Sequence, residues 1–105
     1  MKAAWTSGMR ARLEDIYSRQ GRGEDVPPAL HLSAEGYAAA GIELGLCDLT
    51  ELAQMVEQIH LRLCHETVAE RTGMDAALWL GADGQLQLPV QQKRAPVYPS
   101  TSEDA

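Results

Sequence analysis

Two histidines and a cysteine stand close together in the stretch IHLRLCHETV, residues 59–68. Imidazole and thiolate groups are common zinc ligands, and a cysteine beside a histidine can serve as an activated nucleophile. His60, Cys64 and His65 therefore raise two chemical possibilities, a metal site and a catalytic pair. The choice depends on which helix faces the three side chains occupy, because residues of one helix meet only when they share a face.

The stretch falls in a helix that we predict over residues 48–71, so angular positions follow at about 100° per residue. Relative to Val56, His60 is rotated by about 40° and Cys64 by about 80°, on the shoulder of the apolar face. His65 is rotated by about 180° and lies opposite that face. His65 is therefore not expected to share a metal with the other two side chains.

A structural zinc site takes four ligands, and this helix supplies two. Cys47 and His31 could complete such a site only through tertiary folding, and neither belongs to a pair. A nucleophile pair of Cys64 and His60 would need an orienting acid and an oxyanion site, and no flanking motif supplies them. We therefore predict a packed helix, no cofactor and no enzymatic activity. The alternative is a metal- or thiol-dependent module that uses His60, Cys64 and Cys47.

The same predicted helix is apolar on a second side. Its core seam has spacings of 3 and 4 and consists of Leu49, Leu52, Val56, Ile59 and Leu63. Leu61 and Val68 lie well away from that seam, at about 140° and 120°. A helix that is apolar on two sides needs two packing partners. One partner is the helical hairpin of its own chain, and the other is a further helix, another copy of the chain or a target protein. Burial of this second side under the first helix is the intrachain alternative. We predict a partner or dimer interface formed by Leu61, Cys64, His65, Val68 and Trp79.

Two other helices flank this region. Apolar residues recur at helical spacing over residues 4–20, and the glycines and prolines of GRGEDVPP, residues 21–28, end that helix. Asp48 and Glu51 stand at capping-box spacing, which predicts the start of the helix over residues 48–71. Since the preceding helix ends only a few residues earlier, the two form an αα-hairpin.

That preceding helix is predicted in LSAEGYAAAGIELG. Ser33 is a suitable N-cap, and Leu32 can pack on Tyr37 as a hydrophobic staple. Gly45 is placed to end the helix in the left-handed conformation. The small residues around Gly41 predict that neighbouring elements approach the backbone closely, and we expect this helix to be central.

A β-hairpin is predicted over residues 76–90. Leu86 and Leu88 alternate with glutamines, which is the period of a strand. A three-residue loop over residues 82–84 pairs apolar residues across the two strands and ends in a glycine that tolerates positive φ. A short helical turn capped by Asp75 is the alternative for its first half.

The length of 105 residues suits one domain. We predict a single helical domain over residues 1–90, with the β-hairpin at its end, and a flexible Pro/Ser/acidic tail over residues 91–105. The fold class is thus mainly α, a three-helix arrangement with a central αα-hairpin and a C-terminal β-hairpin. Two cysteines, no leader and no long apolar run predict a cytoplasmic protein with reduced thiols.

The net charge of −6 disfavours binding to nucleic acid or to an anionic membrane. The charge is uneven, with five basic and two acidic side chains in residues 1–22, and nine acidic side chains and one arginine in residues 23–70. A helix-turn-helix would place its second helix on DNA, but the acidic helix over residues 48–71 has the wrong charge for that role. We therefore predict a protein partner and no direct contact with nucleic acid.

The blocks RARLEDIYSRQGRGEDVPP, LSAEGYAAAGIELGLCDLTEL and KRAPVYPS resemble small helical QslA-like quorum-sensing antiactivators, over residues 10–65. The resemblance implies a non-enzymatic protein that binds a LuxR-type transcription regulator and blocks its dimerisation or its binding to DNA. It assigns no functional residue. We expect a protein-binding regulator that is a homodimer; a structural subunit of a larger complex is the alternative.

Overall fold

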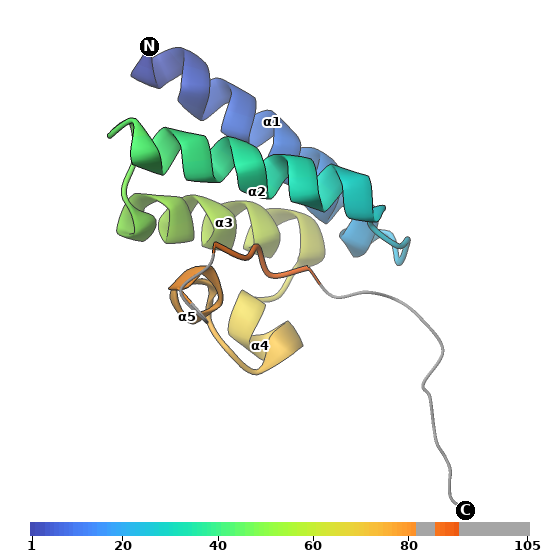
Figure 1. Cartoon of the computed structure of the whole chain (residues 1–105). Helices are drawn as coiled ribbons and strands as arrows, with labels where there is room; N and C mark the ends of the chain where they lie inside the picture. Colours follow the sequence, from blue (N-terminus) through green and yellow to red (C-terminus); the bar gives the residue numbers. More distant parts are fainter. Residues whose placement is uncertain (82–85, 91–105) are drawn as a thin grey trace, which may run out of the picture.

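The computed structural model describes residues 1–81 and 86–90, and every regular element within them is a helix (Figure 1). The helices of this part are α1 (Lys2–Gly21), α2 (Pro28–Glu43), α3 (Leu49–Cys64), α4 (Val68–Thr72) and α5 (Ala76–Gly81). In the part described, no helix is both long and apolar enough to cross a membrane. The prediction of a mainly α fold is confirmed, and the predicted tail over residues 91–105 lies outside the described residues.

Helix α1 organises the core, as its predicted apolar periodicity requires. It packs against both α2 and α3, and α5 packs on another side of α3 (Figure 1). One side of α1 is buried along its whole length, through Trp5, Met9, Leu13, Ile16, Tyr17 and Gln20. The predicted helix over residues 4–20 is therefore confirmed. It starts two residues earlier and ends one residue later than predicted.

Aromatic rings and glycines interlock at the contact between α1 and α2. A Cβ atom on Gly41 would collide with the Trp5 ring, and one on Gly8 would collide with the Tyr37 hydroxyl. The Trp5 and Tyr37 rings stack with centroids 5.7 Å apart, and each donates a hydrogen bond to the other's carbonyl, at 3.1 and 3.2 Å. The Arg12 guanidinium covers the Tyr37 ring at 3.9 Å. The predicted close approach at Gly41 is therefore confirmed, and Trp5 is the neighbour that makes it.

The start of α2 differs from the prediction. The helix begins at Pro28, and the predicted N-cap Ser33 lies exposed inside it. Leu32 is 59 % exposed, so the predicted staple on Tyr37 is wrong as well. The physical reason is that proline is tolerated in the first helical turn, where its missing N–H would have no partner in any case.

The expected central place of α2 is also wrong. Only Ala34, Ala38 and Gly41 are buried in this helix, and its other side is largely exposed. Residues 44–48 join α2 to α3, yet each of these helices has its main contact with α1. Gly45 ends α2 as predicted, with φ of 75°, while the Leu46 N–H donates to the Gly41 carbonyl at 2.8 Å.

The predicted capping box starts α3: the Asp48 side chain accepts from the Glu51 N–H at 2.8 Å, and Glu51 accepts from the Asp48 N–H at 3.1 Å. The predicted extent of this helix is wrong, because it ends at Cys64 and His65 takes the left-handed conformation with φ of 60°. A second capping box explains the break. Thr67 and Glu70 satisfy each other's backbone N–H groups, at 2.8 and 3.0 Å, and begin α4.

The predicted β-hairpin is wrong, and the helical alternative for its first half holds. Helix α5 occupies residues 76–81, and the Asp75 side chain accepts from the Leu78 N–H at 3.1 Å. Residues 86–90 form no strand; the Leu88 N–H instead donates to Glu35, at 2.8 Å. The predicted hairpin loop over residues 82–84 lies outside the described residues.

Candidate functional site

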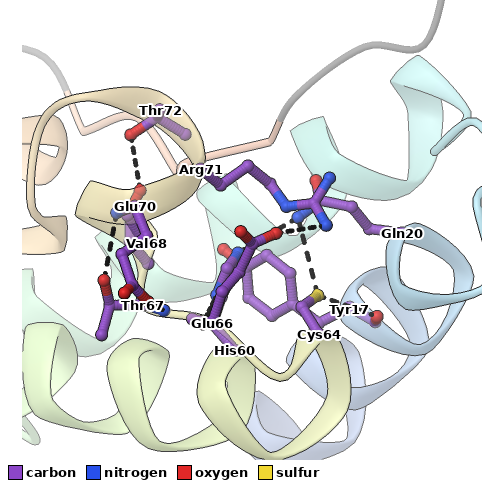
Figure 2. A network of polar contacts seen from close by, with 10 residues as sticks. All are labelled: Tyr17, Gln20, His60, Cys64, Glu66, Thr67, Val68, Glu70, Arg71 and Thr72. Atoms are coloured by element: carbon purple, nitrogen blue, oxygen red, sulfur yellow. Dashed lines mark hydrogen bonds and ion pairs between the residues drawn. The ribbon is translucent and has the colours of Figure 1, made fainter.

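The stretch that raised the question of chemistry forms a buried polar cluster (Figure 2). His60 is fully buried, and its Nδ1 lies 2.7 Å from the Glu66 carbonyl, which can only accept, so Nδ1 carries the proton. The Nε2 atom of His60 then accepts from the Gln20 side-chain amide at 3.2 Å. Burial lowers the pKa of His60, since the charged imidazolium would lose its hydration. The ring is thus a neutral structural link between α1, α3 and the start of α4.

Cys64 belongs to the same cluster, and the partners of its sulfur are Tyr17 and Gln20. Its Sγ donates to the Tyr17 carbonyl at 3.5 Å and accepts from the Gln20 amide at 3.7 Å. Burial raises the pKa of the Cys64 thiol, because a thiolate would be poorly solvated there. A protonated thiol engaged with a backbone carbonyl is a poor nucleophile. The arrangement therefore does not resemble an activated cysteine–histidine pair.

The other ligands considered for a metal do not join the cluster. Cys47 precedes the first turn of α3 and Cys64 is its last residue, so about 25 Å of helix separates them. His65 is exposed and lies outside the buried group around His60. Within residues 1–81 and 86–90, no three His, Cys, Asp or Glu side chains are gathered closely enough to hold a metal ion.

Polar contacts around this cluster fix the bend between α3 and α4. Arg71 forms an ion pair with Glu66 at 2.6 Å, and Figure 2 places this pair beside Gln20. Glu57 accepts from the Val68 N–H at 3.3 Å and from the Ala76 N–H at 3.1 Å, so one carboxylate caps α4 and α5 together. These contacts join sequence positions that no local motif connects.

The predicted interface residues separate into two groups. Leu61 is 51 % exposed and His65 is exposed, whereas Cys64 and Val68 are buried in the core and Trp79 is half-buried. The premise that Leu61 and Val68 share a helix face is wrong, because α3 ends at Cys64. Val68 is buried within the chain itself, at the start of α4. An interface that includes Leu61 and His65 stays a prediction.

An apolar groove of about 420 Å³ lies between α2 and α5, where the sequence did not predict a site. Its walls come from the C-terminal half of α2, the first residue of α3, the end of α5 and Leu86. The lining residues are Ala39, Ile42, Glu43, Leu49, Leu80, Gly81 and Leu86. Leu49 is 45 % exposed, and Leu44, which follows the lining residue Glu43 in the sequence, is 69 % exposed. Burying such side chains against a partner is favourable.

A second hollow of about 370 Å³ continues along α2 and shares Leu86 with the groove. It is lined by His31, Leu32, Glu35, Trp79, Leu86, Gln87, Leu88 and Val90. Glu35 connects α2 to the segment around Leu88, since its carboxylate accepts from the Leu88 N–H at 2.8 Å. The same carboxylate lies 3.9 Å from His31 Nε2. Trp79, one of the predicted interface residues, therefore borders a surface hollow.

The two hollows reveal a second stripe on α2. Leu32, Glu35, Ala39, Ile42 and Glu43 line them, whereas Ala34, Ala38 and Gly41 are buried in α2. The residues that line the hollows follow one another at intervals of three, four, three and one positions, so they lie on one face of the helix. A helical wheel of α2 could have found this stripe, but its modest apolar content gives a weak signal.

One carboxylate, that of Glu43, lines the groove. Two more, those of Asp48 and Glu51, stand close to Leu49 in the chain, at the start of α3. Lys2 forms an ion pair with Glu51 at 3.3 Å. Among the described residues, no other ion pair involves any of these three carboxylates. The described lining of the groove thus carries one negative charge and no positive one, and the start of α3 beside Leu49 is also acidic.

Comparison with protein-family models, with curated proteins and with solved structures finds no match to this chain.

Proposed function

We propose that this chain is a small protein-binding regulator without enzymatic activity that acts by burying the apolar groove between α2 and α5 against a partner protein. The observation that carries the proposal is a hollow of about 420 Å³ with apolar walls and half-exposed Leu49 at its edge. Aliphatic side chains at the edge of a concave apolar surface gain free energy when a partner removes them from water. The protonated, hydrogen-bonded Cys64 and neutral His60 favour this proposal over a thiol-dependent module.

The QslA-like resemblance implies a LuxR-type transcription regulator as the partner, and we include that partner class in the proposal. Occupying an apolar surface of such a regulator would block its dimerisation or its access to DNA. The net charge of −6 supports a protein partner over direct contact with nucleic acid or an anionic membrane. A cytoplasmic homodimer is part of the same proposal, and the exposed surface of Leu61 and His65 is its predicted dimer face, separate from the groove that takes the partner.

A matched pair of substitutions on α3 tests the groove. Leu49→Glu adds a charge at the groove, and Leu61→Glu adds the same charge to a leucine of similar exposure, 51 % against 45 %, outside the groove lining. The exposed half of one leucine is worth about 1 kcal/mol of burial, and desolvating the new carboxylate adds to the loss. Binding through the groove should therefore weaken more than tenfold for Leu49→Glu.

The measurement compares the proteins that the immobilised wild-type chain and the two variants retain from a lysate of the native organism. A specific partner should be retained by the wild type and by Leu61→Glu, and lost by Leu49→Glu. A glutamate at position 49 is favourable for the helix itself, because it stands in the first turn of α3. If both variants retain the same proteins as the wild type, the groove is not the binding surface.

A further inference from the structure

We infer that the occupant of the groove is an amphipathic helix of the partner protein, with an apolar stripe two to three turns long and basic residues beside it. This inference rests on the proposed function and specifies the chemistry of the partner. It follows from three features of the described surface: the backbone of the groove walls, the spacing of the two hollows and the charge at one end.

The walls favour a helical occupant. Most of the lining of the groove comes from α2, α3 and α5, whose backbone groups are largely paired within the helices. Residues 1–81 and 86–90 contain no strand, so the described surface offers no sheet edge to an extended peptide. An extended peptide would then leave its own N–H and C=O groups without partners as it was buried, whereas a helix satisfies them internally.

The spacing of the hollows sets the length of the apolar stripe. The groove contacts α2 at residues 39, 42 and 43, and the second hollow contacts it at residues 31, 32 and 35. The centres of these two sets are separated by roughly 13 Å along α2 at a rise of 1.5 Å per residue. A helix beside α2 reaches both hollows with apolar side chains two to three turns apart.

The charge at the Leu49 end sets the sign of the flanking residues. Glu43 forms no ion pair within the described residues, and Asp48 is used as a helix cap without a cationic partner there. Glu51 is paired with Lys2, and both of these side chains are exposed. Lysine or arginine beside the apolar stripe would complement these carboxylates, and acidic residues would be repelled.

Model peptides test the inference directly. The probe is an 18-residue helical peptide of leucine and lysine with one leucine stripe, compared with a leucine–glutamate peptide that has the same stripe. Isothermal titration calorimetry measures the dissociation constant of each peptide with the full chain at 0.15 M salt. We expect the basic peptide to bind at least tenfold more tightly than the acidic one.

The matched variants separate docking in the groove from general charge attraction. Leu49→Glu and Leu61→Glu give the chain the same added negative charge, so pure charge attraction would tighten both complexes with the basic peptide equally. Docking in the groove predicts at least tenfold weaker binding for Leu49→Glu and no weakening for Leu61→Glu. Glu43→Gln should weaken the basic peptide severalfold and leave the acidic peptide no weaker.

Four results would overturn the inference. Equal affinities of the two variants for the basic peptide would exclude the groove, and equal affinities of the two peptides would exclude a basic partner. A wild-type dimer by light scattering whose mass halves in Leu49→Glu would identify a second copy as the occupant. If neither peptide binds but a native partner is still lost by Leu49→Glu, the proposed function stands and the helical, basic occupant is wrong.

Discussion

Replacing Gly41 by alanine should destabilise this protein, although alanine is the better helix former. The new Cβ would collide with atoms Cε2, Cζ2 and Nε1 of the Trp5 ring. That ring cannot easily move away, because it is buried, stacked on Tyr37 and hydrogen-bonded through Nε1 at 3.1 Å. Overpacking costs about 1–3 kcal/mol, and the gain in helix propensity returns at most about 1 kcal/mol. The net loss should therefore be up to about 2 kcal/mol.

Gly36 provides the matched control on the same helix. A Cβ at Gly36 would meet no atom within 4 Å, so Gly36→Ala should stabilise the protein by about 0.5–1 kcal/mol. The two substitutions are chemically identical and have opposite expected signs. Each kcal/mol shifts the melting temperature of a domain of this size by roughly 4–8 °C, which thermal or urea unfolding resolves easily.

A double substitution identifies Trp5 as the cause. Phenylalanine lacks the indole atoms that a Cβ at Gly41 would meet, so Gly41→Ala should cost less in a Trp5→Phe background than in the wild type. The reasoning would be refuted if Gly41→Ala stabilised the wild-type chain as much as Gly36→Ala does, or if its cost did not depend on Trp5.

Two further predictions concern the polar side chains of His60 and Glu57. Burial lowers the pKa of His60 below 6.5, so the unfolded chain takes up the proton first as the pH falls. The contribution of His60 to stability should therefore be complete above pH 6.5 and should be lost as the pH drops toward the folded pKa. Urea unfolding from pH 8 to 5 should show this slope in the wild type and in His65→Gln, and a smaller slope in His60→Gln. Glu57→Ala should cost about 1–3 kcal/mol, because the N-termini of α4 and α5 lose a shared acceptor. Exposed Gln58→Ala should change stability by less than about 0.5 kcal/mol, and equal costs for the two substitutions would contradict the shared cap.

Local signals predicted α1, the end of α2 and the start of α3, because each depends on neighbours a few residues away. The periodicity of residues 4–20 fixes the buried side of α1. The Asp48–Glu51 capping box and the positive φ of Gly45 act within single turns, so residue types and spacing are sufficient. The break after Cys64 had a local signal as well, the capping box of Thr67 and Glu70, which the apolar periodicity through this region obscured.

The second half of the chain required tertiary contacts. Residues 76–81 have no decisive local preference between strand and helix, and the carboxylate of Glu57, 19 positions from Ala76, accepts the first N–H of α5. The alternation of Leu86 and Leu88 suggests a strand, but a strand needs a paired backbone, and the Leu88 N–H is taken by Glu35, 53 positions away. Short elements gain little from their own propensity, so such distant contacts decide their conformation.

The sequence alone therefore determined that this is a mainly helical acidic chain, because composition and apolar periodicity are local properties. His65 is exposed, but α3 ends at Cys64, so the place of His65 follows from the left-handed end of the helix and not from the angle of a continuous one. Only the tertiary structure decided that His60 and Cys64 are both bound by Gln20 of α1, at 3.2 and 3.7 Å. The groove likewise exists only in the tertiary structure, since its walls come from α2, α3, α5 and Leu86. No local pattern encodes a concave surface whose walls meet only when segments far apart in the chain pack together.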